Sequence, residues 1–144
     1  MSDLRYLEVA RYRVIFGDCD PMRIMYNGCY FRRFEIGWTE LFPALGEPLP
    51  SCVARGLYLA VIDTMCRYVK PARYDDHLII RAALTNVGAA RFEVHYEIRR
   101  HDDELLARGR TVHAVLDEAG RPQRVPEEFK QAAQRLLLEV TGDK

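Results

Sequence analysis

The sequence has no excess of charge of either sign, since 21 Lys and Arg side chains balance 21 Asp and Glu side chains over 144 residues. Without a net field, the chain has no general attraction for nucleic acid or for an anionic membrane surface. It also lacks a long apolar run near its start, because Asp3, Arg5 and Glu8 interrupt the first residues. We therefore expect neither a signal peptide nor a membrane span, and a cytoplasmic protein with no nucleic-acid or membrane partner.

Cysteine and histidine are few and are not spaced as metal ligands. The four cysteines form no C-x-x-C pair, and the four histidines are scattered along the chain. Neither a zinc site nor a disulfide framework is indicated, and we interpret the cysteines as reduced, buried thiols. The chain also lacks the G-x-S-x-G pattern of a serine hydrolase and the glycine-rich phosphate loop of nucleotide-binding proteins. We expect no metal and no cofactor.

Glycine and proline are sparse as well, with 9 and 7 residues, and no repeat or linker-like run divides the chain. With 49% hydrophobic and 29% charged residues, the composition is typical of a folded globular protein. At this length a chain buries about two-thirds of the surface that it exposes when unfolded, so one core suffices. We predict a single domain over residues 1–144.

A long helix is predicted in the first third of the chain. Apolar side chains recur there at helical spacing, at Phe31, Phe34, Trp38, Leu41, Phe42 and Leu45. Asn27 is placed to cap the N-terminus of this helix, and Pro43 and Gly46 are expected to end it. A stripe this broad is expected to be covered completely by a sheet.

Most of the remaining chain has the pattern of strands. Alternation of apolar and polar residues predicts a first strand at about Leu7–Phe16 and, after a turn-prone GEPLPS run, four more strands at about Leu57–Val69, His77–Val87, Arg91–Arg100 and Leu105–Asp117. A closing helix is expected after Pro126, with Phe129, Ala132, Ala133, Leu136 and Leu137 on one face. Short connections favour antiparallel pairing, and strands this long must curl. We predict an α+β protein in which a curved antiparallel sheet wraps one long central helix, the arrangement called a hotdog fold.

The loop between the first strand and the helix carries the most informative chemistry. It reads FGDCDPMRIMYNGCYF from Phe16 to Phe31 and places two carboxylates, Asp18 and Asp20, before a helix N-terminus. Free backbone N–H groups and the helix dipole make such an N-terminus a donor for an oxyanion. An aspartate before a helix is more often a capping residue than a catalyst, so the pattern alone leaves both interpretations open.

A resemblance to a known family favours the catalytic interpretation. The motif FGDCDP, the aromatic Tyr26 and the run YFRRFE that ends at Glu35 resemble the signature of the 4-hydroxybenzoyl-CoA thioesterase family of hotdog enzymes. The similarity continues through the YDD of residues 74–76, the clean alternation of residues 92–98 and the GRP of residues 120–122. It therefore covers most of the chain, and its specific part is the block from Phe16 to Glu35.

The resemblance implies hydrolysis of an acyl-CoA thioester without a metal or cofactor. It assigns Asp20 as nucleophile or general base, and the backbone N–H of Asn27 as the group that polarises the thioester carbonyl. Met25, Tyr26 and Tyr30, beside the helix start, are expected to be walls of the acyl pocket. The family also pairs subunits so that each pocket lies at their junction, which implies a homodimer or a homotetramer.

Some positions depart from the family pattern. Arg23 stands where glycine is typical, and we expect its guanidinium either to pair with Asp20 or to reach a CoA phosphate. Asn27 replaces a histidine or an aromatic residue, and Cys29 replaces a common asparagine, so contacts to the acyl group stay open. Of a basic cluster that related enzymes often use to bind CoA phosphates, only Arg91 is present, which makes acyl carrier protein an alternative carrier of the acyl group.

Other functions remain as alternatives. A hydratase or dehydratase acting on acyl thioesters uses the same fold, but its chemistry needs a histidine that this loop lacks. A non-catalytic acyl-binding protein is a further alternative. Within hydrolysis, Glu35 is a second candidate carboxylate, because a separate group of hotdog enzymes uses one on the helix.

Overall fold

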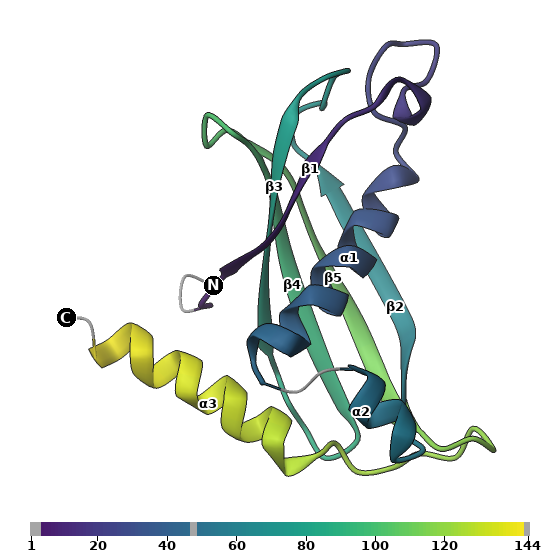
Figure 1. The fold of residues 1–144 in the computed structure, drawn as a ribbon, viewed down its shortest axis with the longest axis vertical. Helices are drawn as coiled ribbons and strands as arrows, with labels where there is room; N and C mark the ends of the chain where they lie inside the picture. The colour runs from purple at the N-terminus through teal and green to yellow at the C-terminus, as the bar shows by residue number, and fades with distance from the viewer. Residues whose placement is uncertain (1–3, 47–48, 143–144) are drawn as a thin grey trace.

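The computed structural model describes the backbone of residues 4–46 and 49–142 and the side chains of residues 4–46 and 51–135. Its five-stranded antiparallel sheet has the order β1-β3-β4-β5-β2, and the long helix α1 crosses one face of that sheet (Figure 1). The strands are β1 (Leu7–Arg13), β2 (Tyr58–Tyr68), β3 (His77–Thr85), β4 (Arg91–Arg100) and β5 (Leu105–Leu116). The helices are α1 (Cys29–Ala44), the short α2 (Leu49–Ala54) and α3 (Glu127–Gly142). The predicted α+β arrangement, with a sheet packed around one long helix, is confirmed.

The alternation of β4 supplies the centre of the core. Phe92, Val94, Tyr96 and Ile98 are all fully buried, as period-2 patterning predicts for the face that a helix covers. The ring of Phe34 on α1 stacks on Tyr96, with ring centroids 4.5 Å apart. The adjacent residue of β5 is Gly109, and a Cβ atom there would collide with the Phe34 ring. The helix therefore approaches the sheet closely because this position has no side chain.

The apolar stripe of α1 is covered only in part. Phe34, Leu41 and Phe42 are fully buried, but Phe31 is 41% exposed. The expectation that the sheet covers the complete stripe is therefore wrong at Phe31. The buried face of α1 is turned toward Tyr30 instead, which is 2% exposed.

Two boundaries before α1 differ from the sequence prediction. The first strand ends at Arg13, and Phe16 is 81% exposed at the start of a short 3-10 turn, Phe16–Asp18. The predicted helix cap is also wrong, because the N-cap residue is Gly28 and no side chain bonds to the helix N-terminus there. The helix entry is held by a backbone turn, in which the Cys29 N–H donates to the Tyr26 carbonyl at 2.9 Å.

Differences after α1 are smaller. The helix ends at Ala44, close to Pro43 and Gly46 as predicted. The six residues of α2 were not predicted, because so short a segment shows no helical periodicity. In α3, Phe129 and Ala132 are buried on the predicted face, whereas the side chains of Leu136 and Leu137 lie outside the described residues. None of the described helices is long and apolar enough to cross a membrane.

Candidate active site

The loop before α1 folds into a small antiparallel hairpin. Cys19 and Met25 form a β-bridge, and the N–H of Asp20 donates to the Ile24 carbonyl at 3.0 Å. The tip closes as a turn in which the Arg23 N–H donates to the Asp20 carbonyl at 2.8 Å. The N–H of Met25 donates to the Ala72 carbonyl at 2.7 Å, which ties the hairpin to the segment before β3. Asp20 thus stands on a backbone that is fixed at both ends.

The first carboxylate of the motif, Asp18, is a structural residue. Its side chain accepts hydrogen bonds from the Tyr12 hydroxyl and, at 2.9 Å, from the N–H of Ile15. Arg33, which is nearly buried on α1, lies 3.4 Å from the same carboxylate and stacks over the Tyr12 ring. Burial, reinforced by the hydrogen bond to Asp18, raises the pKa of Tyr12 to about 12. Both oxygens of Asp18 therefore have partners, which join β1, the loop and α1.

The second carboxylate, Asp20, faces a cavity instead. The N–H of Met22 donates to its Oδ1 at 2.8 Å, and no ion pair to Asp20 occurs among the described residues. One backbone hydrogen bond orients the carboxylate but leaves its other oxygen available. An oriented and unpaired carboxylate is what a nucleophile or general base requires.

The start of α1 offers backbone donors beside this carboxylate. The Tyr26 N–H donates to the Asp18 carbonyl, and the N–H groups of Cys29 and Tyr30 donate to carbonyls within the helix entry. Within the described residues, no acceptor takes the N–H of Asn27 or of Gly28. The sequence pointed to Asn27, and Gly28 is an additional free donor that it missed.

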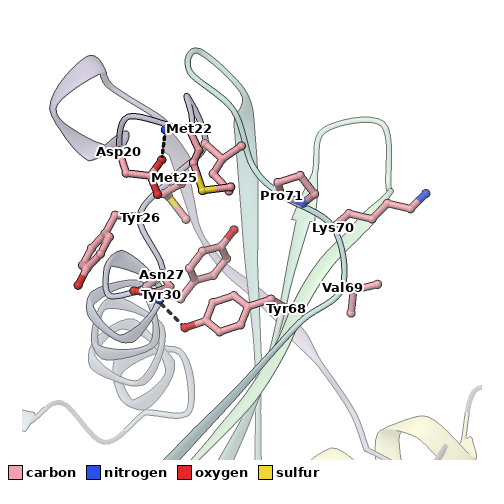
Figure 2. Close-up of a pocket in the computed structure, with 11 residues that line it drawn as sticks. Asp20, Met22, Met25, Tyr26, Asn27, Tyr30, Tyr68, Val69, Lys70 and Pro71 are labelled. Carbon is pink, nitrogen blue, oxygen red and sulfur yellow. Dashed lines mark hydrogen bonds between the residues drawn. The ribbon is translucent and has the colours of Figure 1, made fainter.

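Asp20 and Asn27 line one cavity of about 370 Å³, together with residues from the far end of β2 (Figure 2). The predicted wall residues Met25, Tyr26 and Tyr30 all line it. Met25 and Tyr30 form its buried floor, each 2% exposed, whereas Tyr26 is 55% exposed. The remaining lining residues are Met22, Ile24, Tyr68, Val69, Lys70 and Pro71.

The wall that ends β2 was not predicted from the sequence. The Tyr68 hydroxyl donates to the Asn27 carbonyl at 2.9 Å, and its ring packs edge-on against Tyr30 (Figure 2). Lys70 lies at the cavity and forms an ion pair with Glu104 at 3.1 Å. Forty residues separate Asn27 from this strand end, so only a long-range packing signal could have found the contact.

Two predicted binding residues do not reach the cavity. Arg23 is exposed at the tip of the hairpin, and none of the ion pairs among the described residues joins it to Asp20. Its φ of +67° lies in the region that favours glycine, which explains why glycine is typical at this position. Arg91 begins β4, and its strand runs nine residues before Arg100 reaches the end of the sheet near the loop, a distance of about 30 Å. Within one chain, Arg91 is therefore remote from Asp20.

The alternative catalytic carboxylate, Glu35, lies outside the cavity. Glu35 is exposed on α1 and does not line the cavity. Within the described part of the chain, no three His, Cys, Asp or Glu side chains are grouped to hold a metal ion.

Comparison with known proteins identifies the class of protein to which the chain belongs. Residues 14–133 match the model of the thioesterase-like superfamily, and the chain belongs to that superfamily. The predicted resemblance to the 4-hydroxybenzoyl-CoA thioesterases, the hotdog fold and the class of enzyme, a thioester hydrolase, are confirmed at this level.

Individual esterases and thioesterases are similar to this chain over most of their length. The chain is 28% identical to a putative esterase of Aquifex aeolicus, over 94% of this chain and 98% of the relative. It is 29% identical to a 1,4-dihydroxy-2-naphthoyl-CoA hydrolase of Synechococcus elongatus, over 99% of this chain and 100% of the relative. Its fold matches the 4-hydroxybenzoyl-CoA thioesterase of Pseudomonas sp. strain CBS-3 with a TM-score of 0.79 and 24% identity, over 89% of this chain and 99% of that one.

Proposed function

We propose that the protein hydrolyses the thioester bond of an acyl-CoA and that Asp20 carries the reaction. The observation that supports this most is that the unpaired carboxylate of Asp20 and Asn27, whose backbone N–H has no acceptor among the described residues, line the same cavity. A thioester carbonyl needs these two groups together, an oxygen that adds to carbon or activates water and a donor for the resulting oxyanion.

The reaction has two forms that balance equally well. In one, the Asp20 carboxylate adds to the carbonyl carbon, the C–S bond breaks with its electron pair on sulfur, and water then hydrolyses the mixed anhydride. In the other, Asp20 removes a proton from the water that adds to the carbonyl carbon, and the C–S bond then breaks so that the thiol leaves with that proton and the carboxylic acid product forms. In both forms the Asn27 N–H stabilises the oxyanion, and one such donor contributes about 3 to 4 kcal/mol in other hydrolases.

The cavity favours a small aromatic or aliphatic acyl group. Its floor is the thioether of Met25 and the ring of Tyr30, with the Tyr26 and Tyr68 rings at its sides. Aromatic rings pack well against rings set edge-on, as Tyr30 and Tyr68 already are. Similarity to a 1,4-dihydroxy-2-naphthoyl-CoA hydrolase supports an aromatic acyl group.

A thiol-release assay over short, long and aromatic acyl-CoAs tests the proposal. We expect Asp20→Asn to lower kcat by a hundredfold or more while the fold persists, because the amide can neither add to carbon nor accept the proton of water. Glu35→Gln is the matched control, since it neutralises an exposed carboxylate outside the cavity, and we expect it to keep full activity.

Other outcomes point to the other functions. If Glu35→Gln abolishes hydrolysis and Asp20→Asn does not, the carboxylate on α1 is the catalyst and the proposal is wrong. Hydration of an enoyl-CoA by the parent would favour a hydratase. Binding of acyl-CoA without release of thiol from any acyl-CoA or acyl carrier protein would favour a binding protein.

A further inference from the structure

A side chain from the edge strand reaches the backbone at the start of the central helix. Tyr68 is the last residue of β2, and its hydroxyl donates to the Asn27 carbonyl at 2.9 Å (Figure 2). The Tyr30 ring lies edge-on against the Tyr68 ring, with ring centroids 5.0 Å apart. This contact restricts the orientation of the Tyr68 ring. Within the described residues, this is the contact by which the cavity wall of β2 bonds to the helix entry.

The hydrogen bond acts on the peptide group next to the free donors. The Asn27 carbonyl and the Gly28 N–H belong to one planar peptide unit and point in opposite directions. Fixing the carbonyl therefore fixes the plane that joins Asn27 to Gly28. The other donor to this carbonyl, the Tyr30 N–H, is at the longer distance of 3.3 Å.

The turn in which the Cys29 N–H donates to the Tyr26 carbonyl at 2.9 Å spans this plane, but that hydrogen bond uses neither of its own polar groups. The N–H groups of Asn27 and Gly28 have no acceptor among the described residues, so no hydrogen bond of their own holds them. Gly28 has no Cβ atom, and glycine has the least hindered backbone of any residue. A donor from outside the helix is what this segment needs in order to keep one orientation.

We propose that Tyr68 is a positioning residue, whose hydroxyl holds the Asn27 carbonyl and thereby fixes Asn27, the residue whose backbone N–H is the proposed donor to the oxyanion in the cavity. This inference rests on the proposed hydrolysis and adds a residue to it that neither the motif nor the resemblance assigns. Tyr68 acts through the backbone, whereas Asp20 acts on the substrate.

The hydroxyl remains a donor over the working range of pH. Burial raises the pKa of Tyr68 to about 12, and the nearby Cys66 thiol adds to the shift. The phenol is therefore protonated at neutral pH and can donate to the Asn27 carbonyl.

The expected effect is confined to the transition state. A donor stabilises the oxyanion only after negative charge has developed, so a misaligned donor lowers kcat and leaves substrate binding nearly unchanged. Removal of the Tyr68 hydroxyl leaves the donors present but less well aimed. We therefore expect a loss of about tenfold, smaller than removal of a donor itself.

The test compares Tyr68→Phe with Tyr58→Phe, using benzoyl-CoA and hexanoyl-CoA as probes. Tyr58 begins the same strand, and its hydroxyl bonds to Glu118 far from the cavity, so this variant removes an equal hydroxyl from β2. For Tyr68→Phe we expect kcat to fall about tenfold, KM to change by less than about twofold, and the thermal midpoint to stay within about 2 °C. Tyr58→Phe should match the parent in all three.

Each other result overturns the inference in a recognisable way. Unchanged kcat in Tyr68→Phe shows that the hydroxyl does not position the donors, and a raised KM with unchanged kcat shows that Tyr68 is only a wall. If Asp20→Asn is inactive and Tyr68→Phe resembles the parent, the proposed hydrolysis stands and this inference alone fails. If the parent hydrolyses neither probe nor any other thioester, the proposed function fails first.

Discussion

Two carboxylates that stand two residues apart, Asp18 and Asp20, have different surroundings. Asp18 receives the Tyr12 hydroxyl, a backbone N–H and the Arg33 guanidinium, so its oxygens are consumed in holding the loop. Asp20 receives one backbone N–H and faces the cavity. The resemblance assigned Asp20 as the reactive carboxylate, and the contacts of Asp18 show that Asp18 has a structural role. The catalytic role of Asp20 stays a prediction.

The most deeply buried histidine gives a prediction at the same scale. His113 is fully buried, with the Phe92 ring stacked on it and the Trp38 ring edge-on. Burial lowers its pKa from 6.5 to about 4. Below pH 6.5 the unfolded chain therefore binds a proton that the folded protein refuses, and stability falls until the folded pKa is reached. This one residue should cost about 3 kcal/mol of unfolding free energy between pH 6.5 and pH 4.

Denaturant unfolding at a series of pH values measures this cost. The variant His113→Gln keeps a polar group for the Thr111 hydroxyl, which lies 2.7 Å from the imidazole, but does not titrate. We expect the parent to lose about 3 kcal/mol more than this variant on going from pH 6.5 to pH 4. Parallel pH curves for the two proteins would show that His113 contributes nothing to the acid sensitivity.

At the scale of elements, the close packing of α1 on the sheet depends on a residue of β5 that has no side chain, Gly109. Gly109 is buried under the Phe34 ring, and a Cβ atom there would collide with that ring and approach the Met65 carbonyl at 2.8 Å. We expect Gly109→Ala to lower the free energy of unfolding by about 3 kcal/mol, because the helix must move off the sheet. Gly17→Ala is the control, since a Cβ atom there meets nothing within 4 Å, and chemical denaturation should give it the stability of the parent within about 0.5 kcal/mol. Equal stability of both variants would mean that Phe34 can turn aside.

Elements were predictable where the signal is local. In β4, the residues Phe92 to Ile98 alternate strictly and are buried as predicted, because the two faces of a strand differ in every second residue. The start of α1 was misplaced by one residue, because a capping side chain is only one of several ways to begin a helix. Asp20 and Asn27 could be predicted to lie close together because only six residues of one loop separate them.

The far wall of the cavity could not be predicted in this way. Tyr68 and Lys70 reach the site because β2 pairs with β5 at the edge of the sheet, with Tyr68 opposite Ala107. That register follows from packing of the whole sheet, and the residue types near Asp20 in the sequence do not indicate it. The distance of Arg91 from the loop could not be predicted for the same reason, because it depends on strand direction and order.

At the scale of the whole molecule, β2 is an edge strand with an unusual surface. Along its length lie four apolar or aromatic side chains that are each 44–46% exposed, Val61, Ile62, Met65 and Tyr68, and no other strand of the described residues pairs with its outer side. Natural edge strands are normally protected by charge, by a covering segment or by a partner. The predicted homodimer or homotetramer would cover this edge, and because Tyr68 also lines the cavity, a second subunit on β2 would lie beside the acyl group.

Breaking that edge tests both the assembly and its link to activity. We expect the double variant Val61→Lys and Met65→Lys to sediment as a monomer where the parent sediments as a dimer or tetramer, because two charges would have to be buried in the interface. Thioester hydrolysis should fall with dissociation, since the side of the cavity formed by Tyr68 would then open to water. Val53→Lys, at an equally exposed apolar position on α2, should change neither property. A parent that sediments as a monomer, or a double variant that still associates, would show that β2 is not the interface. A monomeric double variant with full activity would show that one chain completes the pocket by itself.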